Sequence, residues 1–281
     1  MTIARPEPES ASAVPVGAAV APLAVTVPAG AADIAGRIAA AMAPLSPALV
    51  LLFGMPAAGL AGLGADLQAV LGAGCHVVGC SSAGEIGPEG YVQDTVVALG
   101  FPGSSFRVGV CVLTDQAQVP VSAWMGMLRR LHAEFRPDLR RSCFGVMLAD
   151  ALARHEDVLA ATLDAAIPGL PVIGASTAMG LGFEQSMIVV DGQAHPGTAV
   201  FLLVETDLAV AELSFSHFSP TARRAVVTAA DPQNRIILEL NAEPAAQEYA
   251  RLAGIPESLL TPTEFARHPL LLRAGRRDHV R

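Results

Sequence analysis

The chain has 281 residues, of which 52% are hydrophobic, 16% charged and only 5% aromatic, and its formal net charge is −8. Such a length and apolar content can bury a sizeable core in one large or two ordinary domains, and they exclude disorder of the whole chain. All 18 basic residues are arginines, which excludes a P-loop lysine, a Schiff-base lysine and a kinase-type lysine. The net negative charge argues against a nucleic-acid surface, which needs a concentrated basic stripe.

Two long stretches without charge, 10–32 and 38–65, raise the question of a membrane segment. Prolines interrupt both, whereas a spanning helix needs about 20 uninterrupted apolar residues. Glu7 and Glu9 lie where a secretory signal carries positive charge. We therefore expect a cytoplasmic protein with no membrane insertion. In that compartment the cysteines, which form no CxxC pair and show no metal-ligand spacing, are expected to be reduced thiols.

Residues 1–30 are rich in Ala, Pro and Val, show no amphipathic period and are predicted to form a flexible tail. After the tail, helical patterns and apolar runs of strand length follow one another. Helices are predicted at 31–42 and 59–71, and strands at 48–53, 77–78, 95–100 and 106–113. The turn at 102–104 joins the last two strands.

The same order of signals returns in residues 144–205. A strand is predicted at 144–148, a helix at 155–166, a strand at 172–173, and paired strands at 187–190 and 198–205 around the turn Asp191-Gly192. One common offset aligns residues 78–83 with 173–178 and residues 51–54 with 146–149, which indicates an internal duplication. The predicted fold class is α/β, with two pseudo-repeated β-α-β-β-β units forming mixed sheets over residues 31–208.

The pattern changes after residue 208, where a partial α+β module is predicted over 209–281. Its expected strands lie at 209–215, 226–228, 235–240 and 270–273, and its helix at 244–252. The last strand has no obvious partner.

Two loops, VGCSSAGEIG and IGASTAMGLG, carry the chemically informative residues, and each follows a short apolar strand. Glycines permit close backbone approach, and adjacent hydroxyls add donors and acceptors beside exposed N–H groups, so a small polar ligand could be held without charged side chains. The alternative is a tight crossover whose hydroxyls cap backbone groups. The predicted ligand-binding residues are Gly79, Cys80, Ser81, Ser82, Gly84, Glu85, Gly174, Ser176 and Thr177.

Catalysis has little support in these loops. Ser81 does not lie in a GxSxG elbow, and the second loop has Ala175 where the first has Cys80. Neither loop matches the dinucleotide pattern GxGxxG. We predict no catalytic residues, and an enzyme that uses Cys80 or Ser81 remains the alternative. His217, in the stretch FSHFSP, is a conceivable axial haem ligand, although a packed, hydrogen-bonded histidine is the ordinary interpretation.

Three segments resemble the FIST sensory domain family. CHVVGCSSAGEIGPEGYVQDTVVALGF is similar to its signature, LPVIGASTAMGLGFEQSMIVVDGQAHPGTAVFLL resembles its second-half segment, and ILELNAEPAAQEYARLAGI resembles the start of its C-terminal portion. The resemblance covers roughly residues 31–275. It implies a FIST N-terminal-like domain over 31–208 and a truncated C-terminal one over 209–281.

The resemblance implies a non-catalytic, intracellular sensory domain of bacterial signal transduction that binds a small ligand such as an amino acid. Its partners would be a histidine kinase, a cyclic-di-nucleotide enzyme or a chemotaxis protein. A subset of the family resembles haem-binding nitric oxide sensors, so haem at His217 is kept as an alternative. Family members usually continue through several more strands, and no kinase, methyl-acceptor or GGDEF-like segment is found here, so we expect signalling to act through a separate chain.

Overall fold

The computed structural model describes residues 19–54, 57–114, 120–153, 155–177, 186–213, 218–232, 234–274 and 277–280. Helices and mixed sheets together confirm the predicted α/β class. The chain divides into two compact units, Met1–Glu212 and Leu213–Arg281.

The first unit consists of two halves with similar element order. The first half contains β1 (Leu23–Pro28), α1 (Ile34–Met42), the 3-10 turn η1 (Ala43–Leu45), β2 (Pro47–Gly54), α2 (Ala57–Leu71), β3 (His76–Cys80), β4 (Glu85–Gly87), β5 (Gly90–Val92) and β6 (Thr95–Pro102). The second half contains β7 (Phe106–Leu113), α3 (Val121–Phe135), β8 (Ser142–Asp150), the 3-10 turn η2 (Ala151–Ala153), α4 (Glu156–Ala166), β9 (Val172–Thr177), β10 (Ile188–Val190), β11 (Gln193–His195) and β12 (Ala199–Thr206).

Two sheets of related topology form the centre of this unit. The strand order is β1-β6-β2-β3-β10-β11 in one sheet and β7-β12-β8-β9 in the other. The parallel pairs are β2 with β3 and β8 with β9, and the other neighbours are antiparallel. The order β1-β6-β2-β3 is therefore repeated as β7-β12-β8-β9, which is the arrangement that an internal duplication predicts.

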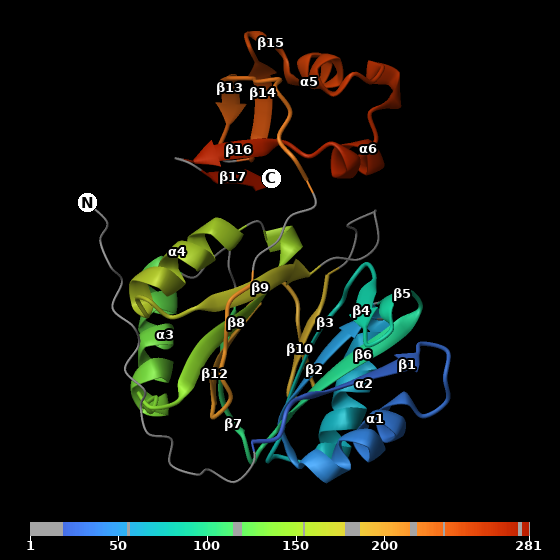
Figure 1. The fold of residues 1–281 in the computed structure, drawn as a ribbon, viewed down its shortest axis with the longest axis vertical. Coiled ribbons are helices and arrows are strands. Elements are labelled where there is room, and N and C mark those ends of the chain that lie inside the picture. Colours follow the sequence, from blue (N-terminus) through green and yellow to red (C-terminus); the bar gives the residue numbers. More distant parts are fainter. Residues whose placement is uncertain are drawn as a thin grey trace, which may run out of the picture. The chain divides into compact units, whose positions relative to one another are not determined.

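The two sheets pack face to face and a helix pair covers each outer face (Figure 1). The alternation of side chains along each strand produces these layers. In β2, Leu49 and Leu51 point into the core between the sheets, and Val50 and Leu52 point toward α1 and α2. Burial on both faces explains why the central strands are continuous apolar runs without polar alternation.

The hairpin β10–β11 belongs to the second half in sequence but extends the sheet of the first half. Ile188 pairs with Cys80 and Val190 with Val78. The turn residue Asp191 accepts hydrogen bonds from Val77 N–H at 3.0 Å and from His76 Nδ1 at 2.9 Å. This interaction raises the pKa of His76 above its usual value. The hairpin therefore joins the two halves through backbone pairing and two hydrogen bonds to the Asp191 side chain.

Four sequence predictions for residues 1–215 require correction. The predicted tail over 1–30 lies outside the described residues as far as residue 18, and it is wrong for residues 23–28, which form β1 and pair with β6. The strand at 106–113 exists but lies in the second sheet, because β1 and β2 already occupy both edges of β6. The first half therefore begins with β1 and α1, and the second half with β7 and α3. The predicted β-α-β-β-β unit does not include this opening strand and helix.

The other two corrections concern residues 187–213. The strand at 187–190 pairs around Asp191-Gly192 with β11, whereas the predicted partner at 198–205 pairs with β7 and β8. The long apolar run of β12 suits a central strand better than a hairpin arm. The predicted strand at 209–215 is wrong for residues 209–213, which are irregular, and its last two positions lie outside the described residues.

The second unit is smaller and less buried. It contains β13 (Val227–Asp231), β14 (Ile236–Leu240), β15 (Glu243–Pro244), α5 (Ala245–Ala253), the 3-10 turn η3 (Glu257–Leu259), α6 (Pro262–Arg267), β16 (Leu271–Ala274) and β17 (Arg277–Val280). Tyr249 of α5 stacks on Phe265 of α6, with ring centroids 4.6 Å apart. The terminal strand predicted without a partner pairs with β17. Within the described residues of both units, no helix is long and apolar enough to cross a membrane.

Candidate functional site

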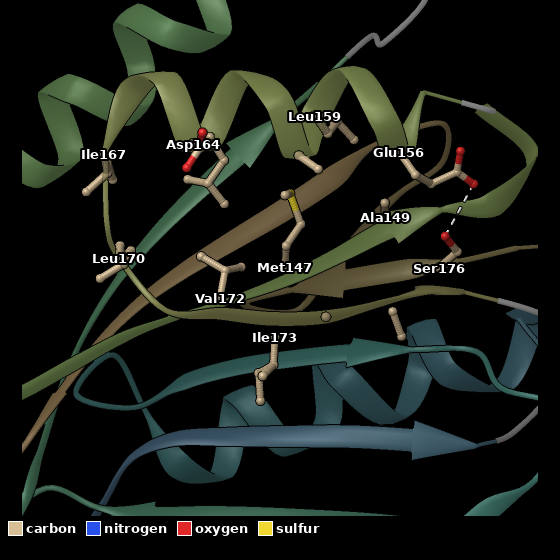
Figure 2. A pocket seen from close by; sticks show the side chains of 14 residues that line it. Met147, Ala149, Glu156, Leu159, Asp164, Ile167, Leu170, Val172, Ile173 and Ser176 are labelled. Atoms are coloured by element: carbon tan, nitrogen blue, oxygen red, sulfur yellow. Dashed lines mark hydrogen bonds between the residues drawn. The ribbon is translucent and has the colours of Figure 1, made fainter. Parts of the chain in front are cut away.

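A pocket of about 520 Å³ lies in the second half, between α4 and the strands β8 and β9 (Figure 2). Its walls are mainly aliphatic, and polar side chains lie at its edges. The residues that line it are Met147, Ala149, Glu156, Leu159, Ala160, Leu163, Asp164, Ile167, Leu170, Val172, Ile173, Gly174, Ala175 and Ser176. The volume lies in the range of small-molecule sites in proteins, about 300–1,000 Å³.

The backbone of β9 forms one wall of this pocket because Gly174 lies very close to β8. A Cβ atom added at Gly174 would overlap the carbonyl oxygen of Met147. A glycine therefore permits this approach, and the second loop sequence IGAST provides it. On β9, Val172 faces the core beneath α4, whereas Ile173 is 58% exposed.

The polar groups of the pocket are concentrated on one helix. Glu156, in the first turn of α4, accepts a hydrogen bond from the Ser176 hydroxyl at 3.3 Å and closes one end (Figure 2). Asp164 lies two turns further along α4 and is exposed. The pocket thus combines an apolar interior with two carboxylates and one hydroxyl.

The two predicted loops meet at the dipeptide Ser186-Met187. Ser81 is fully buried, its N–H donates to the Met187 carbonyl at 3.0 Å, and its hydroxyl oxygen accepts from the Met187 N–H at 3.1 Å. The Thr177 hydroxyl is hydrogen-bonded to the Ser186 hydroxyl. The Ser81 hydroxyl therefore caps a backbone group, as the alternative interpretation of the loops predicts, whereas the Thr177 hydroxyl pairs with another side chain.

A buried carboxylate organises the rest of the first loop. Glu85 is 6% exposed and accepts hydrogen bonds from Ser82 at 2.6 Å and Thr95 at 3.3 Å. Gly54, at φ +114°, leaves room for that carboxylate, since its added Cβ would lie 3.0 Å from Glu85 Oε1. The arrangement fixes the loop between β3 and β4 against β6.

Comparison with models of known protein families gives a match to this chain. The model of the FIST N domain matches residues 48–243. The chain belongs to the FIST family. FIST domains are sensory domains of signal transduction. A comparison with curated proteins finds no significant match to the chain.

In this FIST domain Cys80 is placed for packing. It is 4% exposed, and burial raises the pKa of its thiol to about 12. The thiolate is the reactive form of cysteine, so this environment suppresses nucleophilic chemistry. Its neighbour Gly79 packs closely on Leu52 and Leu60.

We predict that Cys80 is alkylated by iodoacetamide about a thousandfold more slowly in the folded protein than in urea at pH 8, because its thiolate fraction falls by that order. Mass spectrometry of the digested protein measures the rate at each cysteine. Cys143 is half-buried and serves as the internal comparison. Rapid modification of Cys80 in the folded protein contradicts this assignment.

The pocket of this FIST domain contains part of the predicted site. Gly174 and Ser176 line it, and Thr177 follows them on β9. The first-loop residues are absent from the fourteen lining residues and lie around Ser186-Met187 or Glu85; they are Gly79, Cys80, Ser81, Ser82, Gly84 and Glu85. The binding roles predicted for all nine residues stay predictions.

The sequence predicts the helix α4 itself but not that one of its faces lines the pocket. The lining residues of α4 recur at helical spacing, Glu156, Leu159, Ala160, Leu163, Asp164 and Ile167. This spacing, with two acids on an otherwise apolar face, was the available signal. His217 lies outside the described residues, and among those described no cluster of His, Cys, Asp or Glu could hold a metal ion.

Proposed function

We propose that this FIST domain is a non-catalytic sensor that binds a small molecule in the pocket beneath α4. The observation that carries the proposal is an apolar pocket of about 520 Å³ with a few polar groups at its edges. Small-molecule sites have this composition, in which apolar walls supply contact area and a few polar groups fix orientation. The pocket also includes Gly174 and Ser176 of the second loop.

The fold supports a route from the pocket to the rest of the domain. The pocket wall β9 ends at Thr177, whose hydroxyl contacts Ser186, and the next residue, Met187, is held by Ser81 of the first half. A ligand that favours one arrangement of β9 and α4 over another would shift the equilibrium between them. We propose that this change is read by a separate signalling protein, such as a histidine kinase or a cyclic-di-nucleotide enzyme.

Binding without catalysis is supported by the environment of the nucleophiles. The burial that raises the pKa of Cys80 disfavours its thiolate. The Ser81 hydroxyl oxygen accepts a hydrogen bond from the Met187 N–H. Ser82 donates a hydrogen bond to Glu85, and in the part of the chain that the structure describes no histidine is hydrogen-bonded to either serine. A serine nucleophile requires an adjacent base of suitable pKa. Haem at His217 stays a prediction.

Filling the pocket tests the proposal. Ala160 lines the pocket on α4, and Ala160→Phe places a ring in its volume. We first screen amino acids, amines and small carboxylates by thermal shift, and then measure the affinity of the best compound by calorimetry. Ala160→Phe is expected to weaken binding at least about a hundredfold, because the ring and the ligand cannot share the space.

Ala165→Phe is the matched control, because Ala165 is exposed on the same helix and is not among the residues that line the pocket. It should leave the affinity unchanged. The proposal fails when no compound raises the melting temperature, or when Ala160→Phe binds as the unmodified protein does.

A further inference from the structure

The pocket beneath α4 has an unusual balance of charge. Of the fourteen residues drawn in Figure 2, two are acidic, Glu156 and Asp164, and none is Arg or His. The third polar side chain, Ser176, is neutral. An anionic ligand, or the carboxylate of an amino acid, would therefore meet like charge without a cationic partner in this lining.

The two carboxylates lie toward opposite ends of the pocket. Glu156 and Asp164 are eight residues apart on α4, which separates their Cα atoms by about 12 Å along the helix axis. In Figure 2 Glu156 lies at the end with Ser176 and Ala149, and Asp164 lies nearer the end with Ile167 and Leu170. Aliphatic side chains fill the wall between them, including Leu159, Leu163 and Met147.

Resting on the proposed binding function, we propose that the ligand is a linear aliphatic diamine with an ammonium group at each end. One ammonium group donates to the Glu156 carboxylate and the Ser176 hydroxyl, and the other donates to Asp164. An ammonium group carries three donors and no acceptor, which matches this acceptor set. The methylene chain lies on the aliphatic wall, where its burial is favourable.

Ligands of equal chain length but different end groups separate the effect of ligand charge on affinity from the effect of ligand size. The probes are 1,8-diaminooctane, octylamine, octanol and octanoate, with affinities measured by calorimetry at low salt. We expect 1,8-diaminooctane to bind most tightly, octylamine more weakly, and octanoate least. Asp164→Asn should weaken 1,8-diaminooctane about tenfold or more, the loss of one charge-assisted hydrogen bond, and should change octylamine little.

Asp157→Asn provides the matched control, because it removes the same charge from the same helix outside this pocket. It should leave the affinity for 1,8-diaminooctane unchanged. The diamine assignment is overturned when octanoate or octanol binds as tightly as 1,8-diaminooctane, or when Asp164→Asn has no more effect than Asp157→Asn. If those ligands nevertheless lose affinity with Ala160→Phe, the binding pocket stands and only its charge preference is wrong.

Discussion

Replacing Glu205 by alanine is expected to lower the free energy of unfolding by about 2–3 kcal/mol, because a buried carboxylate that accepts several charge-assisted hydrogen bonds is lost and its donors lose their acceptor. Glu205 lies near the end of β12 and is 1% exposed. Its carboxylate accepts from Arg107 at 3.1 Å, from Arg141 at 3.1 Å and from the Asp138 N–H at 2.6 Å. Arg107 lies on β7, and Asp138 and Arg141 lie in the connection between α3 and β8, so this one carboxylate of β12 joins β7 and that connection.

The same network predicts a dependence on pH. Burial raises the pKa of Glu205, but the Asp138 N–H and the Arg107 guanidinium more than offset this, and the net pKa is lowered. Because the unfolded pKa of glutamate is about 4.3, the stabilisation is fully present above that pH and is lost as the pH falls through the folded pKa. Urea unfolding of the protein and of Glu205→Ala should therefore differ most near neutral pH and converge in acid.

Glu134→Ala is the control for an exposed ion pair. Glu134 is bonded to Arg130 at 2.8 Å on the surface of α3. Exposed pairs at this spacing contribute about 0.3–0.5 kcal/mol. A loss of less than about 1 kcal/mol in Glu205→Ala would show that the hydrogen bonds to this buried carboxylate do not stabilise the sheet in the way that the contacts indicate.

The central strands and most helices of the first unit were predictable because local pattern decides them. The runs that became β2 and β8 are apolar, of strand length, and buried on both faces. The start of α1 is marked by Asp33, whose carboxylate caps Gly36 N–H at 3.0 Å. Which strands pair with one another is not decided by the local sequence. β7 follows β6 after a short turn and yet lies in the other sheet, because both edges of β6 are taken by distant segments.

In the candidate site, too, some features are visible in the local sequence and others depend on the fold. The glycine and hydroxyl residues of the loops stand out in sequence, but the partners of Ser81 and Thr177 are known only from the fold. The sequence of α4 has the amphipathic pattern of any helix that packs on a sheet. Only its position over Gly174 and Met147 shows that one of its faces lines a pocket. β1 was missed because its alternating run Val25-Thr26-Val27 is short and lies between Pro22 and Pro28, and because its order depends on pairing with β6.

Phe201 connects the core of the second half to the pocket. It is fully buried in the middle of β12, and its ring packs over Gly145 of β8, where an added Cβ would lie 2.6 Å from the ring. It belongs to the apolar cluster between the sheet and the helices α3 and α4. That cluster also contains residues that line the pocket, namely Met147, Ala149, Leu159, Leu163, Ile167 and Val172.

We expect Phe201→Ala to lower the free energy of unfolding by about 3–5 kcal/mol, through lost burial and the cavity that remains. It should also weaken ligand binding, because the pocket residues of α4 lose the ring that supports their layer. Phe201→Leu fills most of the volume and should cost less in both measurements. Urea unfolding gives the stability, and calorimetry with the best compound of the screen gives the affinity.

A comparison with the other core layer separates a local effect on the pocket from general destabilisation. Phe101 is buried between the two sheets and packs edge-on against Phe106 at 5.2 Å between ring centroids, in a cluster that does not include α4. Phe101→Ala should destabilise the protein to a similar degree while leaving the affinity of the folded protein unchanged, because no pocket residue packs against it in that cluster. Equal losses of affinity in Phe101→Ala and Phe201→Ala would show that the pocket depends on global stability and not on the layer beneath α4.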